Sequence, residues 1–138
     1  MTATVHAAIG AGLGALLKTP GKAFIAGVIS HHFADKTPHK EASLILDVPA
    51  VIALLCFFRA RYGGKSPQFW GALGALAPDF EHVLEVLGIL EEGHCFFATH
   101  RNDGEMHGRS EKYGNQVLAA FLGGLLAETR SEPNKPSR

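Results

Sequence analysis

The sequence predicts an all-α protein, a compact bundle of about five helices in which the fourth helix is kinked at Pro78. Apolar runs recur along the chain and are separated by Gly, Pro and charged residues, as expected for helices joined by turns. No stretch shows the strict alternation of apolar and polar residues that a half-buried strand requires. With 138 residues, the chain fits one helical domain over residues 1–130, followed by a disordered polar tail over 131–138.

The first predicted helix covers residues 4–17 and consists almost entirely of small apolar residues. Gly10 and Gly14 form a GxxxG pattern flanked by alanines, which allows another helix to approach its backbone closely. His6 is the one titratable group on this surface. It is a candidate metal ligand, although an isolated histidine at a helix start is more often capped or solvated.

The second predicted helix covers residues 22–35 and ends in the sequence GVISHHFADKTPH over Gly27–His39. His31 and Asp35 are four residues apart, so their side chains meet on one helical face. Pro38 stops the helix, and the chain then turns so that His39 can return to the same point. The stretch therefore predicts a site for one divalent metal, with a solvated helix end as the alternative.

The third helix is expected to begin near Asp47, whose carboxylate would cap the free amides of that helix, and to continue as an apolar run through Phe58. It carries no chemistry beyond packing. The fourth helix starts at Ser66-Pro67, with serine as the cap and proline in the first turn.

Pro78 lies inside the fourth helix and is followed by Asp79 and His82, which share one helical face, while Glu81 points elsewhere. Polar groups buried in an apolar helix need compensation, and a bound metal would supply it. In the alternative, Asp79 caps the second half of the helix and His82 is exposed.

Residues 91–112 form a polar, Gly-containing, His-rich loop that includes His94, His100 and His107. A loop of this length is usually functional or disordered, and the Phe96-Phe97 pair suggests that it is anchored. The fifth helix is predicted over residues 110–129. Its expected packing stripe consists of the large apolar residues Val117, Leu118, Phe121, Leu122, Leu125 and Leu126.

Charge and hydropathy restrict the partners of the chain. The 13 basic and 13 acidic residues give a formal net charge of zero, so no broad basic surface is available for nucleic acid. The apolar runs are shorter than the roughly 20 residues that a spanning helix needs, but the GxxxG helix and the polar pair at Pro78 favour contact with lipid. We expect a membrane-associated protein with lipid as its partner, or otherwise a cytoplasmic one, with a homo-oligomer as a further option.

Four short motifs resemble the family of membrane-bound metal-dependent hydrolases and, more distantly, zinc-dependent phospholipase C. These motifs are TVHAAIGAGLG at 4–14, GVISHHFADKTPH at 27–39, WGALGALAPDFEH at 70–82 and the segment around THR at 99–101. The resemblance implies a set of metal ligands drawn from all four motifs: His6, His31, Asp35, His39, Asp79, His82 and His100.

The hypothesis that follows is a membrane-associated hydrolase that depends on a divalent metal, with zinc preferred by imidazole and carboxylate ligands, and that acts on a phosphoester. Glu81 would serve as the catalytic base. The alternative is a non-enzymatic helical membrane or scaffold protein, in which a structural metal or a buried His/Asp hydrogen-bond network locks the helices together.

Overall fold

The computed structural model describes residues 1–40, 43–91, 96–97 and 113–129. Within these residues it contains five helices and no strand, so the predicted all-α bundle is confirmed. The helices are α1 (Ala3–Leu17), α2 (Pro20–Asp35), α3 (Leu44–Tyr62), α4 (Pro67–Val86) and α5 (Gly114–Thr129). The predicted tail and most of the His-rich loop lie outside the described residues.

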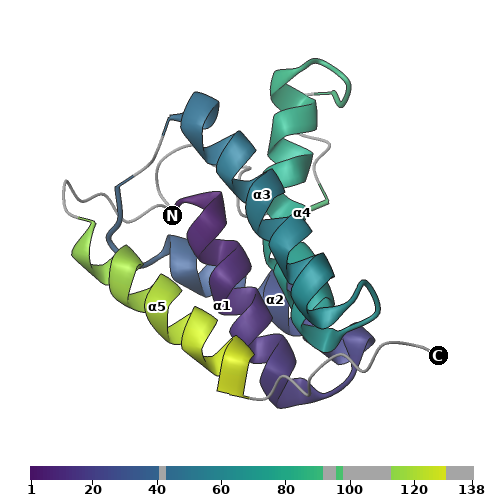
Figure 1. The fold of residues 1–138 in the computed structure, drawn as a ribbon. Helices are drawn as coiled ribbons and strands as arrows, with labels where there is room; N and C mark the ends of the chain where they lie inside the picture. The colour runs from purple at the N-terminus through teal and green to yellow at the C-terminus, as the bar shows by residue number, and fades with distance from the viewer. Residues whose placement is uncertain (41–42, 92–95, 98–112, 130–138) are drawn as a thin grey trace.

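Helix α1 lies at the centre of the bundle and packs against all four other helices (Figure 1). The most extensive contacts are those of α2 with α4 and those of α1 with both α4 and α5, and α1 and α2 also pack against each other. Helix α3 makes fewer contacts with α1 and α4. The side chains of the α1, α2 and α4 interfaces can therefore meet in one place.

These interfaces are close because glycines face one another across them. A Cβ atom added to Gly10 would lie 2.2 Å from the carbonyl oxygen of Gly71, and one added to Gly27 would lie 2.3 Å from the same oxygen. A Cβ atom on Gly74 would lie 2.0 Å from the carbonyl oxygen of Phe24. The close approach predicted from Gly10 and Gly14 is confirmed, since Gly14 packs equally tightly against Pro67.

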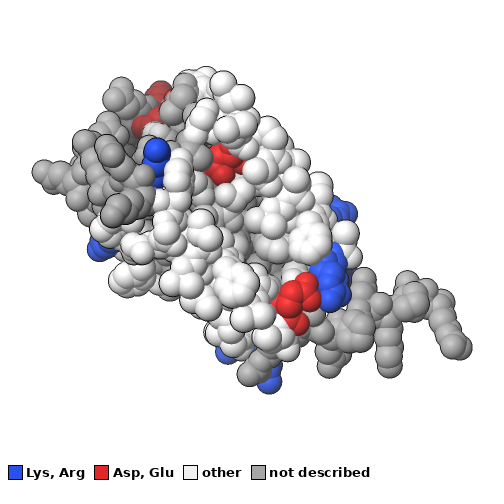
Figure 2. All heavy atoms as spheres, turned by 60° about the vertical axis from the view of Figure 1, so that its left-hand side comes forward, with Lys and Arg blue, Asp and Glu red and all other residues white. Residues whose placement is uncertain are grey.

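Because the helices meet at small residues, the large apolar side chains lie outside. The prediction for the fifth helix was wrong in this respect. The buried face of α5 consists of Gln116, Gly123 and Ala127, and Gly123 packs on the backbone of Ala8. The residues expected to pack inward are all exposed: Val117, Leu118, Phe121, Leu122, Leu125 and Leu126. On the side of the molecule that carries α5, charged groups are few and scattered over a broad uncharged surface (Figure 2).

Helix α3 begins three residues earlier than expected, at Leu44, with Ser43 at the N-cap position. Asp47 therefore lies inside the first turn, and its carboxylate binds another helix instead of capping its own. It accepts hydrogen bonds from the backbone amides of Ala3 at 2.7 Å and Thr4 at 3.4 Å, and from the Thr4 hydroxyl at 3.2 Å. The first turn of α1 contains no acidic residue, so its free amides are satisfied by α3.

Helix α4 runs continuously through Pro78, whose side chain is fully buried. The predicted cap is confirmed, because the Ser66 hydroxyl accepts a hydrogen bond from the Phe69 amide at 3.1 Å. Among the described residues, we find no helix that combines the length and the apolar character needed to cross a bilayer.

The glycine contacts generate a paired test. Gly71→Ala would place a methyl group 2.1 Å from the carbonyl oxygen of Gly10, so we expect a loss of about 1–3 kcal/mol in the free energy of unfolding from overpacking. Gly124→Ala is the matched control, because no atom lies within 4 Å of its added Cβ. It should stabilise α5 by roughly 0.5–1 kcal/mol. Urea unfolding measures both, and equal effects of the two substitutions would contradict the close-packing interpretation.

Candidate metal centre

Asp35, at the end of α2, lies at the centre of a buried polar group. Its Oδ1 atom accepts a hydrogen bond from His6 Nε2 at 2.9 Å, and its Oδ2 atom lies 3.0 Å from His31 Nε2. The two imidazole rings stack with centroids 4.0 Å apart. His6 is 1% exposed and His31 is fully buried. The pairing of His31 with Asp35 confirms the prediction from their spacing, and His6 joins them from α1 as expected.

Backbone carbonyls fix the orientation of two of the imidazoles. The Nδ1 atom of His31 donates to the carbonyl oxygen of Ala75 at 2.8 Å, and that of His39 donates to the carbonyl oxygen of Thr37 at 2.7 Å. A carbonyl oxygen can only accept, so both Nδ1 atoms carry a proton. The Nε2 atoms are thereby directed into the site. Metal-ligating histidines are commonly oriented in this way, by a hydrogen bond from the nitrogen that does not bind the metal.

The charges of the three central groups follow from their contacts. Burial raises the pKa of Asp35, but hydrogen bonds from His31 and His6 outweigh it and hold the pKa far below its ordinary value. Burial lowers the pKa of His31, but the Asp35 hydrogen bond and the negative charges of Asp79 and Asp35 raise it overall. For His6, burial dominates and lowers the pKa. Without a metal, an Asp35–His31 ion pair is therefore accompanied by a neutral His6.

Asp79 of α4 completes a group that can hold a metal ion. Its Oδ1 atom is 3.7 Å from His31 Nε2, and one potential ligand atom from each of His6, His31 and Asp79 lies within 4.8 Å of the others. The three residues come from α1, α2 and α4. The side chain of Asp79 is 27% exposed, whereas the two imidazoles are buried.

Two further observations show that these residues fit a cation. The Nδ1 atom of His6 is buried and has no hydrogen-bond partner among the described residues. The amino group of Met1 donates to Asp35 Oδ1 at 3.0 Å, the same oxygen that His6 contacts, and it also contacts His39 Nε2. A positively charged group is thus held where a carboxylate and an imidazole converge. Two imidazoles with a carboxylate are a donor set that can bind a divalent metal ion.

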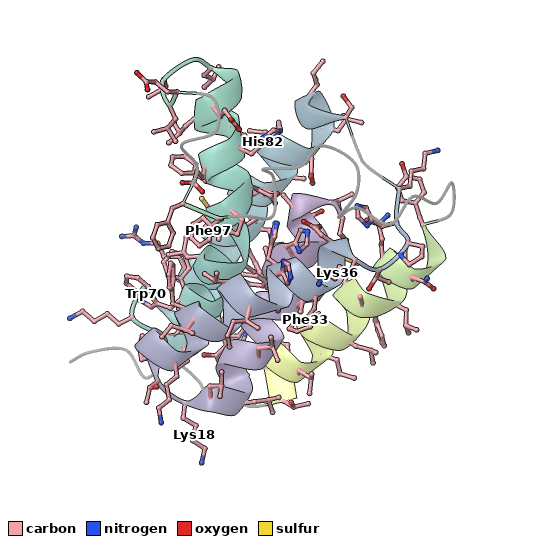
Figure 3. All side chains as sticks on the ribbon, turned by 180° about the vertical axis from the view of Figure 1, so that it is seen from behind. Lys18, Phe33, Lys36, Trp70, His82 and Phe97 are labelled. Carbon is pink, nitrogen blue, oxygen red and sulfur yellow. The ribbon has the colours of Figure 1, made fainter. Side chains whose placement is uncertain are left out.

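The remaining predicted site residues lie elsewhere. Among the described residues, His82 is not a member of the group that could hold a metal. Its Nδ1 atom lies 3.5 Å from Glu85 Oε2, and Figure 3 shows His82 on α4, away from Lys36 at the end of α2. The two oxygens of Glu81 accept hydrogen bonds from the backbone amides of Phe96 and of Phe97, the latter at 2.7 Å. These contacts explain how the loop is anchored at residues 96–97. His100 lies outside the described residues.

The sequence interpretation missed Gln116, which is 1% exposed and binds two segments next to the site. Its one signal in the sequence is its position as a polar residue in the first turn of an otherwise apolar helix. Such a residue is ordinarily assigned to solvent. The contacts of Gln116 span 114 and 76 residues along the chain, and no local pattern reveals partners at that distance.

Fold and site together define a class of protein: an all-α bundle closed by glycine and alanine contacts around a buried His/Asp group with a candidate metal site. Comparisons of the chain with protein-family models, curated proteins and solved structures give no match. The function is therefore argued from the site itself.

The ion pair at Asp35 generates a pH-dependent prediction. Asp35→Asn removes the nearer of the two carboxylates beside the buried His31 and leaves only Asp79, 3.7 Å away, so we expect the free energy of unfolding to fall by about 3 kcal/mol near pH 6 without metal. The lowered pKa of Asp35 gives stability above its ordinary value of 3.8 that is lost as the pH falls. The raised pKa of His31 gives stability below 6.5 that is lost as the pH rises through the folded-state value.

The difference between wild type and Asp35→Asn should consequently be largest between about pH 4 and 6.5 and smaller on either side. Urea unfolding across this range measures it. The control is His82→Gln, because that side chain is 43% exposed and its replacement should change the free energy of unfolding by less than about 0.5 kcal/mol. A difference that does not vary with pH would refute the ion pair.

Proposed function

We propose that this protein is a metal-dependent hydrolase in which His6, His31 and Asp79 hold one divalent metal, zinc by preference. The observation that carries the proposal is the convergence of their ligand atoms within 4.8 Å from three different helices. The carbonyl of Ala75 supports it by fixing the His31 tautomer. The phosphoester as substrate class rests on the four motifs that resemble membrane-bound metal-dependent hydrolases.

Each residue of the site has a definable task. Asp35 accepts a hydrogen bond from His6 Nε2 and so orients that ring with Nδ1 left for the metal, while its charge lies beside His31 Nε2 and balances positive charge in a buried place. The exposed edge of Asp79 leaves a side from which a substrate and water can enter. A bound zinc ion would polarise the phosphoester and lower the pKa of a water molecule. Both oxygens of Glu81 are engaged by main-chain amides, which favours an anchoring role for this residue over proton transfer.

The outer surface supports association with lipid. Large apolar side chains on α2 and α5 point outward, including Ile29, Phe33 and Phe121, while the interfaces between helices consist of glycine and alanine. Helices surrounded by lipid show this arrangement, because lipid provides no hydrophobic force to drive large side chains inward. Extensive exposed apolar surface on a protein in water marks an interaction site.

A second candidate function is favoured by the burial of the imidazoles. His6 and His31 are almost inaccessible, and structural metal sites are closed, whereas catalytic sites keep a position open for water or substrate. The alternative is thus a non-enzymatic helical protein in which a metal, or the His/Asp network alone, holds α1, α2 and α4 together. Metal content and hydrolysis, measured on the same sample, distinguish the two.

Metal binding provides the direct test. After chelation and dialysis, we expect the wild-type protein to bind about one zinc ion per chain in a calorimetric titration. His6→Ala should weaken binding by about tenfold or more, since even residues outside the ligand set contribute 10–100-fold. The control is His32→Ala, which removes a histidine of α2 that lies outside the candidate group. Equal affinity of wild type and His6→Ala would contradict the site.

The zinc-loaded protein should also hydrolyse a chromogenic phosphodiester at a rate that His6→Ala reduces and His32→Ala leaves unchanged. Zinc binding that raises the melting temperature without any metal-dependent hydrolysis would instead establish the structural alternative.

Lipid association is tested by flotation of the full chain with vesicles of neutral phospholipid. We expect wild type to float with the vesicles, and Phe121→Ser combined with Leu125→Ser to reduce the floating fraction, because both side chains lie on the exposed apolar face of α5. The control is Gly124→Ser, on the same helix but without an apolar side chain. Recovery of wild type as a monodisperse species in the vesicle-free fraction would refute the assignment.

A further inference from the structure

Gln116 of α5 connects two chain segments, residues 1–2 and 39–40, that meet beside Asp35, where the Met1 amino group contacts both the Asp35 carboxylate and His39. Its Oε1 atom accepts a hydrogen bond from the Thr2 amide at 3.1 Å, and its Nε2 atom donates to the Lys40 carbonyl oxygen at 2.7 Å. The side chain is 1% exposed. Both ends of one buried carboxamide are thus used, each by a different part of the main chain.

The first contact leads to His6 through a single residue. Thr2 is the N-cap of α1, and its carbonyl oxygen accepts the backbone amides of Val5 at 3.0 Å and His6 at 3.2 Å. Gln116 therefore binds the amide of Thr2, and the carbonyl oxygen of the same residue accepts the hydrogen bond from the His6 amide. The hydrogen bond to Gln116 thus restrains the residue before the first turn, in addition to the contacts that Asp47 makes with Ala3 and Thr4 inside that turn.

The second contact leads to His39. Lys40 follows His39 directly, and the turn over residues 37–40 directs the buried His39 ring towards the amino group bound to Asp35. His39 and Lys40 belong to no helix, so the hydrogen bond from Gln116 to the Lys40 carbonyl is a tertiary restraint on this turn. One side chain thus fixes the segments that carry both histidines.

We infer that Gln116 is a positioning residue for the candidate metal centre, holding His6 and His39 in register with Asp35 from a helix that contributes no ligand. The expected effect on metal affinity rests on the proposed function. The expected effect on the NMR resonances of the histidines rests only on the hydrogen bonds of Gln116. Residues that orient metal ligands typically contribute 10–100-fold to metal affinity.

The test compares Gln116→Met with Gln68→Met in the full chain. Methionine retains an unbranched side chain of similar length but cannot replace either hydrogen bond of Gln116. Gln68 is the matched control, because it is a buried glutamine that packs beside Gly14, at the other end of α1 from His6. Zinc affinity should fall by about 10–100-fold in Gln116→Met and remain unchanged in Gln68→Met.

A second pair of variants tests one hydrogen bond alone. Thr2 has a φ of −64°, which proline adopts, so Thr2→Pro breaks this contact: it removes the donor and places the ring Cδ against Gln116 Oε1, which lies 3.1 Å from the Thr2 nitrogen. Thr2→Ala is its control, because it loses only the hydroxyl that contacts Thr4. Zinc affinity should fall in Thr2→Pro relative to Thr2→Ala, and this comparison decides the matter if Gln116→Met does not fold.

Imidazole nitrogen NMR of the metal-free proteins provides a readout independent of zinc. The ring resonances of His6 and His39 should shift in Gln116→Met and not in Gln68→Met, while Thr2→Pro should shift those of His6. If wild type binds no zinc, the metal proposal fails and these shifts alone still support or overturn the positioning role. Unchanged His6 and His39 resonances in Gln116→Met and Thr2→Pro would overturn it.

Discussion

The close approach of helix backbones at glycine is the constraint on which the rest of this structure depends. Gly10, Gly27 and Gly71 bring α1, α2 and α4 into direct main-chain contact. This separation lets a short aspartate side chain and two imidazoles from three helices meet, with ligand atoms within 4.8 Å of one another. Larger residues at the same positions would push the helices apart and separate the polar groups.

The buried polar group is balanced internally. Asp35 carries the negative charge, His31 is favoured in its charged form, and His6 is held neutral by burial. Each polar atom that finds a partner in this group avoids the cost of leaving water without compensation. The same features that make the group tolerable in a protein interior, namely convergent imidazoles beside carboxylates, also make it suitable for a divalent cation.

The parts of the site that were predictable from the sequence are those set by local geometry. The pairing of His31 with Asp35 follows from helical periodicity, and close packing at Gly10 follows from residue size. The predicted orientation of α5 was wrong. The prediction followed the rule that a helix in water turns its large apolar residues towards the core, whereas in this structure Gly123 of α5 faces α1. The partners of Asp47 and Gln116 lie 43 or more residues away along the chain, so only the folded bundle reveals them.

Asp47 of α3 caps the start of α1, the helix that carries His6, so this part of the site depends on the packing of α3 against α1. Helix α1 has no side-chain cap of its own and no acidic residue in its first turn, so its free amides depend on a carboxylate from a helix that follows α2. A nascent chain that has formed only α1 and α2 already contains His6, His31 and Asp35, but the start of α1 then frays. The start of the helix that carries His6 is therefore capped only when α3 has docked against α1.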